Sequence, residues 1–308
     1  MIADKFSAQF GNLNSSIDII VRLMFMLKDP DIDNSSMAEV VAEDKVLSSN
    51  LLKKLEQLSN KEDGVVSFAS PDDPKDQPPS KEEIIDSIAL AIMRIGHTEM
   101  LKQVSGISFG KILGVELKGY GIAKNELWVH SVIVALIAQQ MAKLINTLEL
   151  EKDENAIKLD PTNAFIAGLL HDLGKAALSA DLAAKSSTFR SKIDSRTNSW
   201  VEVEKHVCTI DHAAYGAQIT AKWKLSEEIC KAIAGHHTPP PNERMTAIVH
   251  LADCGSRMIG SAPGIAGFAF RTDARALQTV NLKMENIEQV IMHVASDQET
   301  IANYCATS

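Results

Sequence analysis

The sequence is poor in cysteine, in aromatic residues and in long apolar runs. No two cysteines form a CxxC pair, and such sparse cysteines are typical of a reducing compartment rather than of a disulfide framework; they are Cys208, Cys230, Cys254 and Cys305. The longest apolar stretches, such as 132–138, are too short to span a bilayer, and the amino terminus has no signal-peptide pattern. We therefore expect a cytoplasmic protein that does not bind membranes.

Positive charge is also in deficit, because the formal net charge of the chain is −9 at pH 7. An acidic chain repels phosphate backbones, which argues against non-specific binding to DNA or RNA. A small phosphorylated molecule or nucleotide remains compatible with this charge. Such a substrate needs only a few cations, and metal ions can supply them.

The alternation typical of β-strands is scarce, whereas helix-forming residues abound. The sequence predicts an all-α protein, a two-part helical bundle, since 308 residues allow about two domains. We expect a helical amino-terminal part at 1–115 and a helical metal-site part, ending in a carboxy-terminal helix, at 116–308. A Pro- and Asp-rich stretch at 60–82 reads as a mobile surface loop, either a plain connector or a partner-binding loop.

Apolar residues at three- and four-residue steps predict where the helices lie. We expect amphipathic helices within 15–58, a helix from Ser80 onwards, and further helices at 127–148, 206–223, 227–236, 243–259 and 284–304. Residues suited to capping helix starts are Ser36, Ser80, Asp160, Ser226 and Asn242.

The sharpest chemical signal is His171-Asp172, followed by Gly174-Lys175, on an otherwise apolar helix. A buried imidazole and carboxylate are costly without partners, and a metal ion removes that cost. Neutral imidazole and carboxylate are also the usual nitrogen and oxygen donors for divalent transition metals. The alternative is a relict motif held by hydrogen bonds.

Companions elsewhere in the chain strengthen this signal. His130 and Asp253 lie on other predicted helices, and a metal site in a helical bundle draws its ligands from several helices. His130, His171, Asp172 and Asp253 would hold a first ion. His212, His236 and His237 would hold a second ion or grip a phosphate, with Asp172 bridging, because two ions about 3.5–4 Å apart can clamp a phosphoryl group. Otherwise these three histidines line a polar pocket or satisfy helix ends.

Three residues are candidates for supporting roles. Lys175 is expected to act in catalysis beside Asp172, by steadying negative charge on a phosphate; the alternative is a solvated lysine. Asp211 either orients a ligand histidine or caps a helix. His250 precedes Asp253 by three residues on the same helix face and is the best candidate for an extra contact to the site.

This ordered set of residues resembles the HD superfamily of metal-dependent phosphohydrolases, and more closely the HDOD family. The segments that carry the resemblance are 164–176, 211–225 and 229–237, and the amino-terminal part matches too, at 27–31, 39–47 and 87–96. The resemblance implies an all-helical fold and a place in bacterial signal transduction. Activity does not follow from it, because many HDOD proteins have lost the metal ligands.

His212, His236 and His237 also resemble ligands of the HD-GYP phosphodiesterases, which cleave cyclic di-GMP. The chain departs from that family at Thr238-Pro239-Pro240, where HD-GYP proteins have Glu and then Gly-Tyr-Pro. This difference argues against cyclic di-GMP as the substrate.

Two functions therefore remain open. The first is a phosphohydrolase that cleaves a phosphoester or nucleotide by metal-activated water, using one or two ions of Fe, Mn, Zn or Ni. The second is a non-catalytic regulatory module that docks a signalling protein, with any metal structural or vestigial.

Overall fold

The computed structural model describes residues 14–59, 79–185, 200–264 and 272–305. Every regular element in these ranges is a helix, apart from an isolated bridge between Leu117 and Ile122. The predicted all-α class is confirmed. The chain divides into two compact units, the first ending at Lys111 and the second covering Ile112–Cys305.

The first unit contains α2 (Asn14–Met26), α3 (Asn34–Val41), α4 (Lys45–Ser59), α5 (Lys81–Ile95) and most of α6 (His97–Leu113). Helix α3 packs on α2 and α5, and α4 packs on α5. Ser80 caps α5 in a reciprocal capping box with Glu83, as predicted. The predicted cap at Ser36 is wrong, because Asp33 caps α3 and accepts the backbone N–H of Ser36. Most of the predicted 60–82 loop, residues 60–78, lies outside the described residues.

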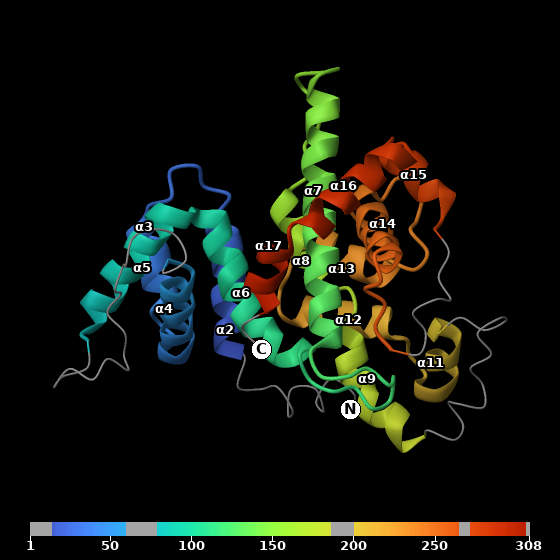
Figure 1. Ribbon diagram of the computed structural model, residues 1–308, viewed down its shortest axis with the longest axis horizontal. Helices are drawn as coiled ribbons and strands as arrows, with labels where there is room; N and C mark the ends of the chain where they lie inside the picture. Colours follow the sequence, from blue (N-terminus) through green and yellow to red (C-terminus); the bar gives the residue numbers. More distant parts are fainter. Residues whose placement is uncertain (1–13, 60–78, 186–199, 265–271, 306–308) are drawn as a thin grey trace. The chain divides into compact units, whose positions relative to one another are not determined.

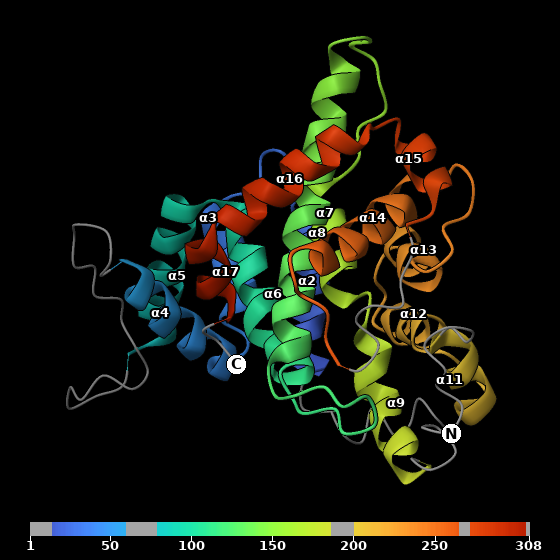
Figure 2. The ribbon, with the colours of Figure 1, turned by 45° about the vertical axis from the view of Figure 1, so that its right-hand side comes forward.

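The second unit is built around α7 (Glu126–Leu150), with α8, α14 and α16 beside it in both views (Figures 1 and 2). The other helices of this unit are α8 (Pro161–Leu170), α9 (Leu173–Ala184), α11 (Trp200–Cys208), α12 (His212–Lys222), α13 (Glu227–Gly235), α14 (Arg244–Met258), α15 (Ala274–Val280), α16 (Met284–Ser296) and α17 (Gln298–Cys305). Asp160 caps α8, with Pro161 at its first position, as predicted.

Helix α7 is long and apolar enough, by length and composition, to cross a membrane. Its most apolar 18-residue window has a mean hydropathy of 1.4, and 78% of that window is buried in the protein. The sequence predicted a helix here but did not mark it as a possible membrane span, because only unbroken apolar runs were considered. The burial is what a core helix requires, because α8, α14, α16 and α17 all pack on it.

Two predicted helices are each broken in two. The expected helix at 206–223 is interrupted after Cys208, because Thr209 has a positive φ of 67° and Asp211 starts α12 as its cap. The expected helix at 284–304 is interrupted at Asp297, where ψ is 63°. The first break matters for the site, since it places α11 and α12 on separate axes.

Small residues let the motif-bearing helices approach closely. A Cβ added at Gly168 of α8 would come within 2.9 Å of Ala135 Cα on α7. A Cβ added at Gly174 of α9 would overlap the backbone of His212 at the start of α12. Glycine at these two positions therefore brings the His171-Asp172 turn against α7 and α12.

Candidate metal centre

Four predicted ligands meet at the centre of the second unit. His130 comes from α7, His171 and Asp172 form the turn between α8 and α9, and Asp253 comes from α14; all four are 0% exposed. His130 Nε2 lies 3.3 Å from His171 Nε2 and 3.3 Å from Asp253 Oδ1. These distances bring His130, His171 and Asp253 together in a group that can hold a metal ion, which we call the first cluster.

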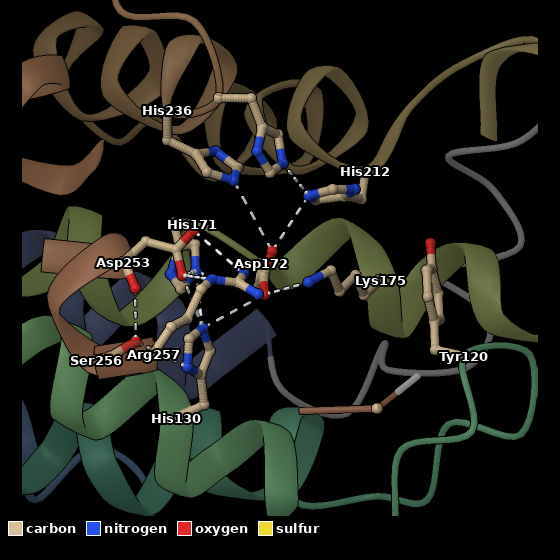
Figure 3. Close-up of polar contacts among 12 residues, drawn as sticks. Tyr120, His130, His171, Asp172, Lys175, His212, His236, Asp253, Ser256 and Arg257 are labelled. Atoms are coloured by element: carbon tan, nitrogen blue, oxygen red, sulfur yellow. Dashed lines mark hydrogen bonds and ion pairs between the residues drawn. The ribbon is translucent and has the colours of Figure 1, made fainter. Parts of the chain in front are cut away.

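The other three predicted histidines form a second cluster, His212, His236 and His237. His212 Nε2 and His237 Nε2 are 2.7 Å apart. Asp172 lies between the two clusters, with Oδ1 3.2 Å from His212 Nε2 and Oδ2 3.4 Å from His171 Nε2. Figure 3 shows His212 and His236 on one side of Asp172 and His130 on the other.

Hydrogen bonds on the far side of each ring decide which nitrogen faces the clusters. Nδ1 of His130 donates to the carbonyl of Ser261, Nδ1 of His171 to that of Gly168, and Nδ1 of His236 to that of Ile233. A carbonyl only accepts, so each Nδ1 carries the proton and each Nε2 presents a lone pair. This is the arrangement of metal-ligating histidines, whose other nitrogen is held by an acceptor.

Two buried atoms facing the clusters are left without hydrogen bonds among the described residues. They are Nε2 of His236 and Oδ1 of Asp172, since the approach of His212 to Oδ1 does not have hydrogen-bond geometry. An unpartnered buried polar atom costs free energy of about 1–3 kcal/mol. Imidazole nitrogen and carboxylate oxygen are both ligand atoms that divalent transition metals bind, so these residues fit a bound metal.

The two carboxylates are paired with cations. Lys175 Nζ bonds Asp172 Oδ2, and Arg257 donates from Nε and a terminal nitrogen to the two oxygens of Asp253, at 3.0 and 3.2 Å. Burial alone would raise the pKa of both carboxyls, but Lys175 and Arg257 hold the pKa values of Asp172 and Asp253 well below their usual range. Both carboxylates are therefore charged and able to bind a cation.

Lys175 is thus neither a solvated lysine nor free in a pocket, because it is 8% exposed and bound to Asp172. Sequence analysis missed Arg257. It lies four residues after Asp253 on α14, so the i, i+4 spacing of opposite charges could have identified it.

Glu204 on α11 is the second residue that sequence analysis missed. Its carboxylate accepts from Nδ1 of His212 at 2.7 Å and from the backbone N–H of His212 at 2.8 Å. Burial lowers the pKa of His212, but the charge and hydrogen bond of Glu204 and the nearby carboxylate of Asp172 outweigh it and raise the pKa to about 9. No local signal marked Glu204, because the predicted helix began only at residue 206.

The two other supporting candidates act through the backbone. Asp211 caps α12 by accepting the N–H of Ala214 at 2.7 Å, which favours its reading as a helix cap. His250 donates from Nδ1 to the carbonyl of His236 at 2.7 Å, and its Nε2 accepts the N–H of Asp273. With both nitrogens engaged, His250 holds the segment that carries His236 and is not itself turned towards the clusters.

Comparison with solved structures supports this fold. The chain superposes on a Shewanella amazonensis SB2B protein named "Putative phosphohydrolase" with a TM-score of 0.60 and 17% identity, covering 94% of this chain and 92% of that one. An HDOD domain protein of unknown function from Geobacter sulfurreducens gives 0.56 and 21%, covering 94% and 90%. A "Putative signal transduction protein" from Marinobacter aquaeolei VT8 gives 0.67 and 16%, covering 95% of this chain and 58% of that one. At such identities the likeness shows the fold alone.

No curated protein matches the sequence. The family model of the HDOD domain matches residues 80–239, just over half of the chain. That range includes His130, the His171-Asp172 pair and the three histidines of the second cluster, and it ends before Asp253. The chain belongs to the HDOD family.

Proposed function

We propose that this protein is a metal-dependent phosphohydrolase of the HDOD type, which acts in cytoplasmic signal transduction on a phosphoester or nucleotide. One observation carries the proposal. Asp172 lies, fully buried and charged, between two groups of histidines, and each of its oxygens faces one group. A carboxylate so placed is suited to bridge two ions.

The residues would divide between two ions. His130, His171 and Asp253 with Oδ2 of Asp172 would hold one, and the second cluster with Oδ1 of Asp172 would hold the other. Ions of Fe, Mn, Zn or Ni all accept such nitrogen and oxygen donors. When bound, the ions supply Lewis acidity towards phosphoryl oxygens and a water activated for nucleophilic attack.

The charges of the site favour an anionic substrate. Lys175 and Arg257 already balance Asp172 and Asp253, so the protein's own groups leave this part of the site close to neutral. Each divalent ion would therefore add positive charge to a buried, low-dielectric region, where an anion is attracted strongly. Lys175 is suited to steady the negative charge that develops on the phosphoryl group.

The test combines metal analysis with an assay. We expect the purified protein to bind Mn²⁺ and to hydrolyse p-nitrophenyl phosphate or its bis-ester. Asp172→Asn should lower turnover by at least about 10²-fold, because a neutral amide would bind the two ions more weakly than the carboxylate. The helical circular dichroism spectrum should stay unchanged. Asp160→Asn is the matched control, since asparagine still caps α8.

The regulatory module is the second candidate. It is favoured by the first unit, α2 to α5, which contributes no residue to any metal-binding group found among the described residues. Mn²⁺ bound without turnover of either ester would support the module and contradict the hydrolase.

A further inference from the structure

Glu204 is an acidic side chain buried in the second unit without belonging to either cluster. It is 0% exposed, and it lies on α11, ahead of the break that separates α11 from α12. Both its oxygens lie within 2.9 Å of His212 Nδ1. A buried carboxylate is retained only when hydrogen bonds compensate its lost hydration, so these contacts define its role.

The support of His212 differs from that of three other ring ligands, His130, His171 and His236. His130, His171 and His236 each donate Nδ1–H to a neutral backbone carbonyl. His212 donates instead to an anionic carboxylate. A carboxylate behind an imidazole raises its basicity more than a carbonyl does, which makes the opposite nitrogen a stronger metal donor.

Glu204 is itself held in place. Tyr120 donates its hydroxyl to Oε1 of Glu204 at 2.9 Å, and the Tyr120 ring lies 5.7 Å from that of Trp200. The backbone N–H of His212 donates to Oε2. Three donors thus converge on one carboxylate, which fixes both the ring and the main chain of His212 at the start of α12.

We propose that Glu204, supported by Tyr120, is the positioning residue of the second cluster. It holds His212 with Nε2 towards the site of the second ion and makes His212 a stronger nitrogen donor than His236. The inference rests on the proposed metal site. It adds that occupancy of the second cluster depends on an α11 residue, whereas occupancy of the first cluster does not.

The test is a titration of the full chain with Mn²⁺, in which isothermal titration calorimetry and electron paramagnetic resonance measure the number of bound ions and their affinities. We expect the wild type to bind two ions. Glu204→Gln should weaken the binding of one ion by about 10–100-fold and leave the other within about threefold, because loss of such a supporting group typically costs that much affinity. Selective loss of one ion is a readout that general destabilisation would not produce.

Tyr120→Phe tests the same role if Glu204→Gln fails to fold, since it removes only the hydroxyl that donates to Glu204. It should weaken the same ion by less than Glu204→Gln does. Glu202→Gln, at an exposed position of α11, is the matched control and should bind as the wild type.

Equal weakening of both ions, or unchanged binding in Glu204→Gln and Tyr120→Phe, would overturn the positioning role while leaving the metal site intact. A wild type that binds no Mn²⁺ would instead overturn the proposed metal site and this inference with it.

Discussion

Gly174 of α9 lies directly against the backbone carbonyl of His212, where the His171-Asp172 turn meets the start of α12. A methyl group at this position has no room, because the atom it meets belongs to backbone and cannot rotate away. The closeness of the two clusters therefore depends on a hydrogen atom in place of a side chain.

Gly174→Ala should lower the free energy of unfolding by roughly 1–3 kcal/mol, as overpacking of a rigid contact does. Gly216→Ala is a control at the same pair of helices, since its Cβ would stay 3.2 Å from Cγ2 of Ile233 and 3.3 Å from the backbone nitrogen of Gly174, tight contacts without overlap. There, the gain in helix propensity of up to about 1 kcal/mol offsets the tight contact. Urea unfolding of both variants measures the difference, and equal losses would contradict this account.

Arg257→Met should destabilise the metal-free protein by about 3 kcal/mol, because it leaves the carboxylate of Asp253 buried and uncompensated. The loss should shrink when Mn²⁺ is added, since the ion replaces the missing positive charge. Arg275→Met removes an exposed pair with Asp273 and should cost less than about 1 kcal/mol. Unfolding curves with and without Mn²⁺ test this; an Arg257→Met loss that metal leaves unchanged would argue against a cation site at Asp253.

Removal of metal by a chelator should lower the unfolding midpoint of the wild type. An ion that binds only the folded chain adds about 2.7 kcal/mol at a hundredfold excess over its dissociation constant. His236→Gln should reduce this increment, because Nε2 of His236 faces the clusters without a hydrogen bond. His97→Gln, whose ring contacts Asn34 in the first unit, should keep the full increment. Identical increments in the two variants would exclude His236 as a ligand.

The metal-free protein should show a pH-dependent contribution from His212. Its pKa is raised from 6.5 to about 9, so the folded chain holds this proton more tightly than the unfolded chain does. The resulting stabilisation is complete below pH 6.5 and is lost as the pH rises through about 9. In the presence of chelator, the gap in unfolding free energy between the wild type and His212→Gln should therefore narrow from pH 6 to pH 9.5. A gap that widens would show that Glu204 and Asp172 do not hold that proton.

Local signals in the sequence were sufficient for much of the fold. Ser80, Asp160 and Ser226 cap the helices they were expected to cap, because capping involves atoms within three residues. The same reasoning failed at Asn242 and at Ser36. Asn242 has a left-handed backbone and is followed by α14 without a side-chain cap, and at α3 Asp33 competes successfully for the cap.

The chemical types of the site residues were also readable from the sequence. The His171-Asp172 pair and its companion histidines stood out because imidazoles and carboxylates are rare among apolar helical runs. Their convergence was expected on that basis, and the structure gathers Asp172 and the six other predicted ligands into neighbouring groups. Their binding of metal stays a prediction.

The sequence by itself determined that this chain is helical, which residues can act as ligands, and the family to which it is related. Only the tertiary structure decided how the ligands divide into two clusters and which groups support them. The sequence did not identify Glu204, because charged side chains are usually exposed and only the packing of α11 against other helices buries this one. The spacing of Arg257 and Asp253 marks a possible ion pair, but only the structure shows that the pair is buried. Burial and partnership depend on helices brought together from distant parts of the chain, and no local pattern encodes that arrangement.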